Sequence, residues 1–225
     1  MAAAPRPITL TIDGKPVTVP EGTTLWDAAR LAGIGIPVLC HSPRLRPVGV
    51  CRMCVVDVGE RVLAAACVRL CSEGQTVATR SDKVQAHRRM LTQLLLSDYP
   101  EHSPRQAATG ADELLDLARS LGVASTPFPD GTRPATARGS DTSSHVIAVD
   151  HQACILCDRC IRACDELQNN DVIGRTSRGY TARIAFDLNN PMGESSCVSC
   201  GECMAVCPTG ALTNKSWAAM TGAKS

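Results

Sequence analysis

The sequence predicts an α+β protein in which two cysteine-rich domains flank a short helical segment. Three observations support this fold class. Thirteen cysteines fall into two groups, within residues 40–71 and 154–207, and none lies between them. Strand-like and helix-like patterns alternate around the first group. Only 3% of the residues are aromatic, so bound metal is expected to supply folding free energy that large core side chains usually supply.

The N-terminal domain, residues 1–80, is predicted to be a small sheet crossed by one helix. Residues 8–19 alternate apolar and polar around a central Asp-Gly pair, which is typical of a β-hairpin. A helix follows within 21–33, and Thr23 or Thr24 can cap it. Short strands are expected after the cysteine-bearing loop, at 54–58, 61–67 and 76–80.

A helical segment and a linker follow this domain. Residues 81–123 contain two helical patterns, at 82–96 and 111–121. Residues 124–145 are rich in Pro, Gly, Ser and Thr, so we expect an extended linker there. The C-terminal domain then occupies 146–225.

The C-terminal domain contains one cysteine spacing twice, C-x2-C-x2-C-x3-C. This is the run of bacterial ferredoxins, in which three thiolates hold one [4Fe–4S] cluster and the fourth ligates the other cluster. We therefore expect two [4Fe–4S] clusters. One would use Cys154, Cys157, Cys160 and Cys207, and the second would use Cys197, Cys200, Cys203 and Cys164.

Two other uses of these cysteines fit the spacing less well. Structural zinc sites typically use two separated cysteine pairs rather than runs of four. A cysteine nucleophile needs a paired base, and the repeated cysteines have no paired histidine.

The N-terminal cysteines form the pattern C-x10-C-x2-C-x12-C, which can supply four thiolates to one [2Fe–2S] cluster. The predicted ligands are Cys40, Cys51, Cys54 and Cys67. Cys71, four residues later, could replace Cys67. We favour Cys67 because it ends an apolar strand pattern, whereas Cys71 lies in the following turn.

Composition and motifs exclude several function classes. A net charge of +1 provides no basic excess for nucleic acid. The apolar runs are too short for membrane insertion, and the N-terminus lacks the apolar core of a signal peptide, so we expect a cytoplasmic protein. No nucleotide-binding fingerprint and no set of catalytic residues is present.

The order of these features resembles a known group of iron–sulfur subunits, and the resemblance covers nearly the whole chain. The stretch "IPVLCHSPRLRPVGVCRMCVVDV" is specific to this group. The group includes the N-terminal part of the large iron–sulfur subunit of complex I, the small diaphorase subunit of NAD-reducing hydrogenases and the N-terminal region of NAD-dependent formate dehydrogenase. The resemblance implies a β-grasp [2Fe–2S] domain, a helical segment and a two-cluster [4Fe–4S] domain. The stretch "GRTSRGYTARIAFDLNNPMGESSCVSCGECMAVCPTGAL" looks most like the formate dehydrogenase branch.

Members of this group usually carry one more [4Fe–4S] cluster between the two domains, with the ligand pattern H-x3-C-x2-C-x5-C. Aligned without gaps, the four ligand positions fall on Tyr99, Ser103, Gln106 and Asp112. Such side chains are poor ligands for a soft iron–sulfur cluster. The resemblance therefore implies that the middle cluster has been lost, while its sequence frame remains.

The implied function is electron relay. The chain would connect a flavin- and NAD-binding diaphorase subunit with a separate catalytic subunit. Our first candidate for that subunit is a molybdenum or tungsten formate dehydrogenase, and our second candidate is a nickel–iron hydrogenase. The main alternative is an independent ferredoxin-like carrier, and a redox sensor with labile clusters is a weaker one.

Overall fold

The computed structural model describes residues 5–100, 104–128 and 138–216. Its contacts divide the chain into two compact units. The first comprises Met1–His41 and Pro47–Leu91, and the second comprises Ser42–Arg46 and Thr92–Ser225. Each unit is described by itself below.

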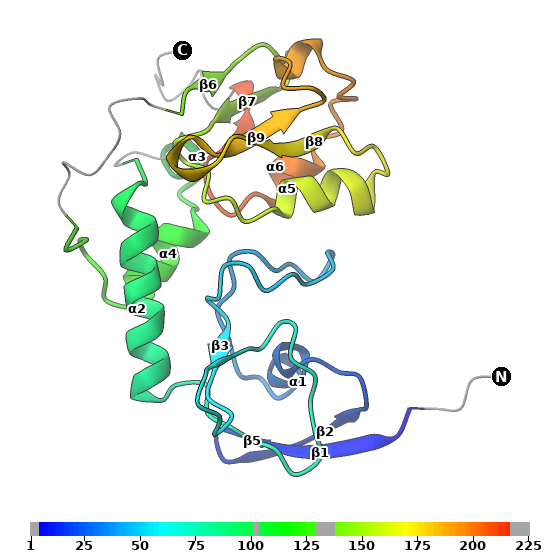
Figure 1. Ribbon diagram of the computed structural model, residues 1–225, viewed down its shortest axis with the longest axis vertical. Helices are drawn as coiled ribbons and strands as arrows, with labels where there is room; N and C mark the ends of the chain where they lie inside the picture. The colour runs from blue at the N-terminus through cyan, green and yellow to red at the C-terminus, as the bar shows by residue number, and fades with distance from the viewer. Residues whose placement is uncertain (1–4, 101–103, 129–137, 217–225) are drawn as a thin grey trace. The chain divides into compact units, whose positions relative to one another are not determined.

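The first unit contains a three-stranded sheet in the order β2-β1-β5. The predicted hairpin is present, because β1 and β2 pair antiparallel, with Leu10 opposite Val17. Strand β5 returns parallel to β1, and β3 pairs antiparallel with β4 (Figure 1). The strands are β1 (Pro7–Ile12), β2 (Lys15–Pro20), β3 (Val55–Val56), β4 (Ala64–Ala65) and β5 (Thr76–Val77).

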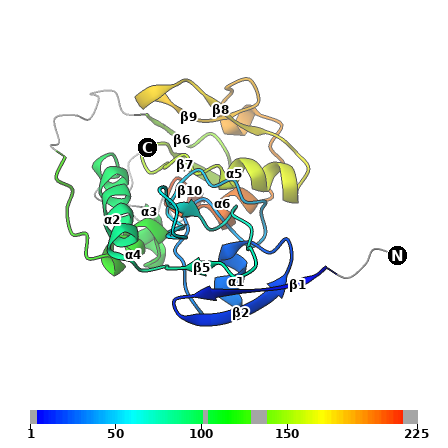
Figure 2. The ribbon, with the colours of Figure 1, turned by 60° about the horizontal axis from the view of Figure 1, so that its bottom comes forward.

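Helix α1 (Leu25–Leu31) packs its apolar face against this sheet, and the two lie side by side in Figure 2. Of the two candidate caps, Thr24 is the one used, because its hydroxyl accepts a hydrogen bond from the Asp27 N–H at 3.1 Å. Leu25, Ala28 and Ala29 are buried in the resulting core.

The strands beyond β2 are shorter than the sequence predicts. The patterns at 54–58, 61–67 and 76–80 each form only two residues of strand. In the first two, Cys54 and Cys67 lie outside the ladder and turn toward each other. We attribute the short strands at 54–58 and 61–67 to this requirement to bring the cysteines together, whereas the structure gives no such reason for 76–80.

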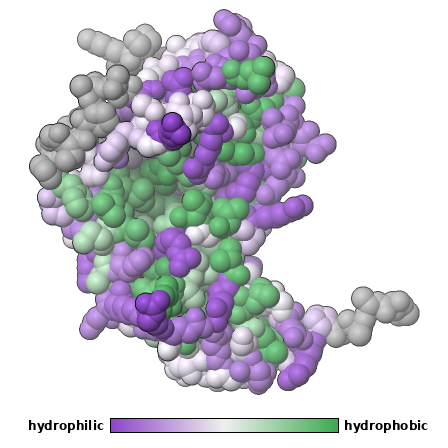
Figure 3. Space-filling view, in the orientation of Figure 1, coloured by the Kyte–Doolittle hydropathy of each residue, from purple (hydrophilic) through white to green (hydrophobic). Residues whose placement is uncertain are grey.

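The helical segment contains three helices, α2 (Asp82–Ser97), α3 (Pro104–Thr109) and α4 (Glu113–Ser120). The boundary between the two units falls inside α2, after Leu91. Helix α2 agrees with the predicted 82–96, whereas α3 was not predicted. Helix α4 starts later than residue 111, because Asp112 caps it. Two apolar residues of α2, Met90 and Leu94, are exposed, and Figure 3 shows apolar surface over the upper part of this helix.

The second unit is built around two short sheets and two cysteine-bearing helical turns. Strands β6 and β10 pair antiparallel with the two edges of β7, and β8 pairs antiparallel with β9. Helix α5 continues into a π-helical turn at Ala163–Leu167 and packs against α6 (Figure 1). The bounds are β6 (Ser140–Asp141), β7 (Ile147–Asp150), α5 (Arg159–Arg162), β8 (Ile173–Thr176), β9 (Arg183–Phe186), α6 (Glu202–Val206) and β10 (Leu212–Asn214).

Part of the predicted linker has regular structure, since Ser140–Asp141 forms β6. Residues 129–137 of that linker lie outside the described ranges. Leu45 comes from the loop between Cys40 and Cys51, and it packs with Ala163 and Val206 in a small apolar cluster of the second unit. Among the helices of the described ranges, none is long and apolar enough to cross a membrane.

Candidate metal centres

Four cysteines of the first unit lie together. The Cys40 N–H donates to Cys51 Sγ and the Cys51 N–H donates to Cys40 Sγ, each at 3.4 Å. The Sγ atoms of Cys54 and Cys67 are also 3.4 Å apart. The sulfur atoms therefore form two hydrogen-bonded pairs. We call these four residues the N-terminal site.

The electrostatics of the N-terminal site favour thiolate at one member of each pair. The Cys40 thiol lowers the pKa of Cys51 to about 5 by hydrogen bonding to it, and Cys67 lowers the pKa of Cys54 in the same way. The pKa values of Cys40 and Cys67 are correspondingly raised. Thiolate is the form that binds iron, so the site presents the donor chemistry that a [2Fe–2S] cluster requires.

A buried arginine fixes the loop that carries Cys54. The side chain of Arg88, on α2, is only 3% exposed. Its guanidinium donates to the Met53 carbonyl at 3.2 Å and to the Val55 carbonyl at 2.8 Å. Burial lowers the pKa of Arg88 to about 10, so it remains charged at neutral pH. The sequence pattern marked Arg88 only as a helix residue.

Cys71 is separate from the N-terminal site in its electrostatics. Burial, and then the charge of Asp27, raise the pKa of the Cys71 thiol, and none of the causes of that shift is a cysteine. Cys67, by contrast, interacts with Cys54, Cys40 and Cys51.

The two cysteine runs of the second unit have the same backbone geometry. In the first run, Leu156 (φ 54°) and Asp158 (φ 61°) are left-handed, and in the second run Ser199 (φ 54°) and Gly201 (φ 81°) are left-handed at the equivalent positions. Left-handed backbone is uncommon for residues other than glycine, and it concentrates at functional sites. Both loops thus repeat the same left-handed turns between their cysteines.

The thiols of the second unit form two sets of neighbours. Cys160 interacts electrostatically with Cys154, Cys157 and Cys207, and also with Cys203. Cys203 interacts with Cys197, Cys200 and Cys164. Cys207, the fourth cysteine of the second run, thus lies near the three leading cysteines of the first run, and Cys164 lies near Cys203 of the second run.

We call these two sets the first site and the second site. The first site comprises Cys154, Cys157, Cys160 and Cys207, and one cavity is lined by all four of them. The second site comprises Cys197, Cys200, Cys203 and Cys164.

The two sites differ in burial. All four cysteines of the first site are buried, and burial raises the pKa of Cys154 to about 11 and that of Cys157 to about 12. In the second site, Cys200 is exposed and Cys197 is half-buried. Buried thiols that must become thiolates need nearby positive charge, which iron supplies.

Within the described residues, no group of three or more His, Cys, Asp or Glu side chains is placed to hold a single metal ion. A cubane cluster makes a different demand, because each thiolate binds its own iron and the four sulfurs need not converge on one point. The neighbour sets therefore fit a cluster better than an isolated ion.

Two of the four positions aligned with the family's middle cluster lie against each other. The Tyr99 hydroxyl donates to Asp112 Oδ2 at 2.5 Å, and both residues are buried. Asp112 Oδ1 also accepts from the N–H groups of Leu114 and Leu115, so it caps α4. Gln106 lies on α3, and Ser103 lies outside the described ranges.

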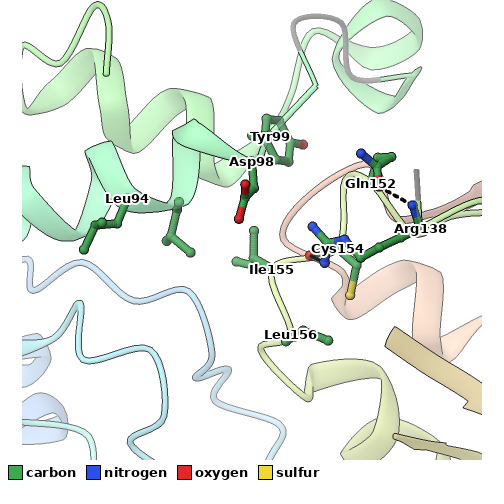
Figure 4. A pocket seen from close by; sticks show the side chains of 9 residues that line it. Leu94, Asp98, Tyr99, Arg138, Gln152, Cys154, Ile155 and Leu156 are labelled. Carbon is green, nitrogen blue, oxygen red and sulfur yellow. Dashed lines mark hydrogen bonds between the residues drawn. The ribbon is translucent and has the colours of Figure 1, made fainter. Parts of the chain in front are cut away.

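The same segment contacts the chain that follows Cys207. The Gly210 N–H donates to the Tyr99 hydroxyl at 3.4 Å, and the Glu113 N–H donates to the Pro208 carbonyl at 2.8 Å. Tyr99 also lines a cavity of about 180 Å³ with Arg138 and Cys154 (Figure 4). Tyr99 and Glu113 therefore contact the chain that follows Cys207 of the first site.

Comparison with known proteins identifies both cysteine-rich parts. Residues 5–82 match the family described as "2Fe-2S iron-sulfur cluster binding domain". Residues 144–213 match "NADH-quinone oxidoreductase subunit 3, ferredoxin-like domain".

Three relatives extend over nearly the whole chain. NADP-reducing hydrogenase subunit HndD of Solidesulfovibrio fructosivorans is 40% identical over 91% of this chain and 36% of its own length. An NADH-quinone oxidoreductase subunit of Rhizobium meliloti is 34% identical over 91% of this chain and 24% of its own length. A chain in the crystal structure of NAD⁺-reducing [NiFe]-hydrogenase in the H2-reduced state superposes with a TM-score of 0.83. That chain is 28% identical, and the match covers 92% of this chain and 87% of that one.

The chain therefore spans about a third or less of the length of the two curated relatives. These relatives and the superposed structure favour the hydrogenase-type resemblance over formate dehydrogenase, which the sequence had placed first.

Proposed function

Because this chain is an iron–sulfur subunit with a [2Fe–2S] domain and a ferredoxin-like domain of the NADH-quinone oxidoreductase type, we propose that it relays electrons within an NAD(P)-linked complex. The relay connects a flavin- and nucleotide-binding subunit with a separate catalytic subunit of the hydrogenase type. The observation that carries the proposal is the crosswise arrangement of the two C-terminal cysteine sets.

The proposed cofactors are one [2Fe–2S] cluster at the N-terminal site and one [4Fe–4S] cluster at each of the other two sites. When bound, iron–sulfur clusters supply one-electron transfer, and the protein sets their position, solvent access and potential. The thiolates hold the iron, the left-handed turns shape the loops, and Arg88 keeps the Cys54 loop in place.

Residues 99–112 form the proposed site of cluster loss. The Tyr99–Asp112 hydrogen bond supports this proposal, because it places a buried polar pair where the family pattern would have two ligands. A carboxylate that already accepts three hydrogen bonds is a poor ligand for a soft iron centre.

The proposed organisation follows from these sites. Residues 1–80 form a β-grasp [2Fe–2S] domain, 81–123 a helical segment, 124–145 a linker and 146–225 the [4Fe–4S] domain. We place the protein in the cytoplasm, because thiolate ligands in such number need a reducing compartment.

The relay is tested on the protein in its native complex. The tagged chain is purified anaerobically from the cells that produce it, and its partners are identified by mass spectrometry. We expect a stable complex with a flavin-containing subunit, in which NAD(P)H produces electron paramagnetic resonance (EPR) signals of reduced clusters. The chain by itself should be reduced by dithionite and not by NAD(P)H. Isolation as a lone monomer would support the independent carrier instead.

The crosswise ligand sets have their own test. Replacement Cys164→Ser should alter the EPR signal of the second site, although Cys164 belongs to the first run in the sequence. Replacement Cys207→Ser should alter the signal of the first site. If each variant instead affects the cluster of its own run, the proposed sets are wrong.

A further inference from the structure

We propose that four arginines raise the reduction potential of the [4Fe–4S] cluster at the first site. They are Arg105, Arg138, Arg159 and Arg175, and we call them the arginine shell. This inference rests on the function proposed above, because it requires a cluster at that site.

Two members of the shell hold the loop that begins at Cys154. Arg138 Nη1 donates to the Cys154 carbonyl at 3.0 Å, and Figure 4 shows the two residues side by side. Arg175 Nη2 donates to the Leu156 carbonyl at 2.7 Å, and its guanidinium also pairs with Asp158 at 2.7 Å. Both guanidiniums are thus tied to the backbone that carries the thiolates.

The other two members hold the chain around Cys207. Arg159 Nη1 donates to the Val206 carbonyl at 3.3 Å, and Arg105 Nη1 donates to the Cys207 carbonyl. Arg159 lies between Cys157 and Cys160, and Glu113 of α4 pairs with it at 2.8 Å. The four arginines therefore reach the first site from α3, α5, β8 and the residue two before β6.

Arg159 also has a buried hydrogen-bond donor with no acceptor among the described residues. Its side chain is 6% exposed, and its buried Nε atom has no hydrogen-bond partner among the described residues. An unpartnered buried donor costs free energy, so such groups are rare unless a ligand satisfies them. A negatively charged cluster between Cys157 and Cys160 is the kind of acceptor that this donor lacks.

Electrostatics link the shell to the thiolates. Arg138 and Arg175 donate to carbonyls of the loop that carries Cys154, and Arg159 donates to the carbonyl of the residue before Cys207. When one electron is added, the cluster with its thiolates becomes one unit more negative. The same positive charges then stabilise the reduced form more than the oxidised form.

The second site differs from the first in its charged neighbours and in its exposure to water. One guanidinium, that of Arg44, pairs there with Glu202 at 2.9 Å, and Glu202 lies next to Cys203. Cys200 is exposed, so water can solvate the charge of a cluster at that site. At the first site the cysteines are buried, and of the arginine shell Arg159 is buried, Arg105 and Arg138 are half-buried and Arg175 is exposed.

The test measures midpoint potentials rather than activity. The full chain is purified anaerobically and titrated with dithionite in the presence of redox mediators, and EPR follows each cluster. Replacement Arg175→Gln should shift the reduction equilibrium of the first cluster by roughly threefold toward the oxidised form, about 28 mV for one electron, because Arg175 is exposed and paired with Asp158. Replacement Arg175→Lys keeps the charge and should restore most of this shift. The second cluster and the [2Fe–2S] cluster should keep their potentials.

Two further variants control the experiment. Arg178 is exposed at the turn of the same β8–β9 hairpin, so Arg178→Gln removes an equal charge and should leave the first cluster unchanged. Glu113→Gln removes the carboxylate that partly neutralises Arg159, so it should shift the equilibrium in the opposite direction. The Glu113 shift should be of similar size, because Glu113 and Arg175 are about equally exposed. Replacement Cys200→Ser identifies the signal of the second cluster, and the other [4Fe–4S] signal then belongs to the first.

The outcomes separate this inference from the proposed function. If the unchanged chain contains no [4Fe–4S] cluster at the first site, the proposed function fails. If the cluster is present and Arg175→Gln and Arg178→Gln have equal effects on its potential, the arginine shell has no tuning role. A shift in the same direction for Arg175→Gln and Glu113→Gln would also overturn the inference.

Discussion

Asp112 provides the most direct test of whether residues 99–112 stabilise the first site without binding a cluster themselves. The replacement Asp112→Ala removes the acceptor of the Tyr99 hydroxyl and the cap of α4 in one step. Loss of the cap costs about 1 kcal/mol, within a range of about 0.5–2. A buried hydroxyl left without its acceptor costs about 1–3 kcal/mol more. We therefore expect a destabilisation of about 2–4 kcal/mol in the second unit.

The assay follows the clusters, because unfolding of a metal-containing chain is not a reversible two-state process. The full chain is mixed with urea and an iron chelator, and the loss of visible absorbance gives a rate. A cost of about 2 kcal/mol corresponds to a rate increase of roughly 30-fold if these contacts break before iron is lost. Asp112→Asn keeps one acceptor oxygen, which can still cap α4, but its amide NH2 cannot accept from the Tyr99 hydroxyl, so its rate should lie between those of the unchanged chain and Asp112→Ala.

Asp116→Ala is the matched control. Asp116 lies on the same helix, but it is exposed and pairs only with Arg119, an exposed pair that contributes little. If Asp112→Ala loses its clusters no faster than Asp116→Ala, residues 99–112 do not support the first site, and the structural role assigned to them is wrong.

Two further predictions concern the N-terminal site. Cys67→Ser should remove the [2Fe–2S] EPR signal, whereas Cys71→Ser should preserve it, and the reverse result would assign the ligand to Cys71. Arg88→Gln removes a charged donor from two carbonyls beside Cys54, at about 1.5–3 kcal/mol for each hydrogen bond lost. It should therefore lower the urea concentration at which the [2Fe–2S] absorbance is lost, while the exposed neighbour Arg89→Gln should not, and equal effects would count against the role of Arg88.

The sequence predicts the hairpin, α1 and α2 well, because their periodicity and capping signals are local. It does not predict α3, since a six-residue helix within a polar stretch has no clear apolar period. It overestimates the strands near Cys54 and Cys67, where the need to bring cysteines together overrides strand propensity.

Spacing predicts the three leading cysteines of each set, because neighbouring ligands in one loop are a local feature, and the crossed fourth cysteine follows from the bacterial ferredoxin pattern. The same reasoning does not predict the arginine shell. Arg105 and Arg138 lie outside the cysteine motifs, and only the fold brings their guanidiniums to the carbonyls of Cys207 and Cys154. Their roles depend on tertiary structure, for which the sequence carries no spacing signal.

The central claim is that the chain holds one [2Fe–2S] and two [4Fe–4S] clusters, with none at residues 99–112. The full chain is purified anaerobically, and its iron and acid-labile sulfide are measured. Both values are divided by the protein concentration, which amino-acid analysis gives. The cluster types predict about ten irons and about ten sulfides per chain. A reproducible value of about fourteen would require a further [4Fe–4S] cluster and would contradict the account.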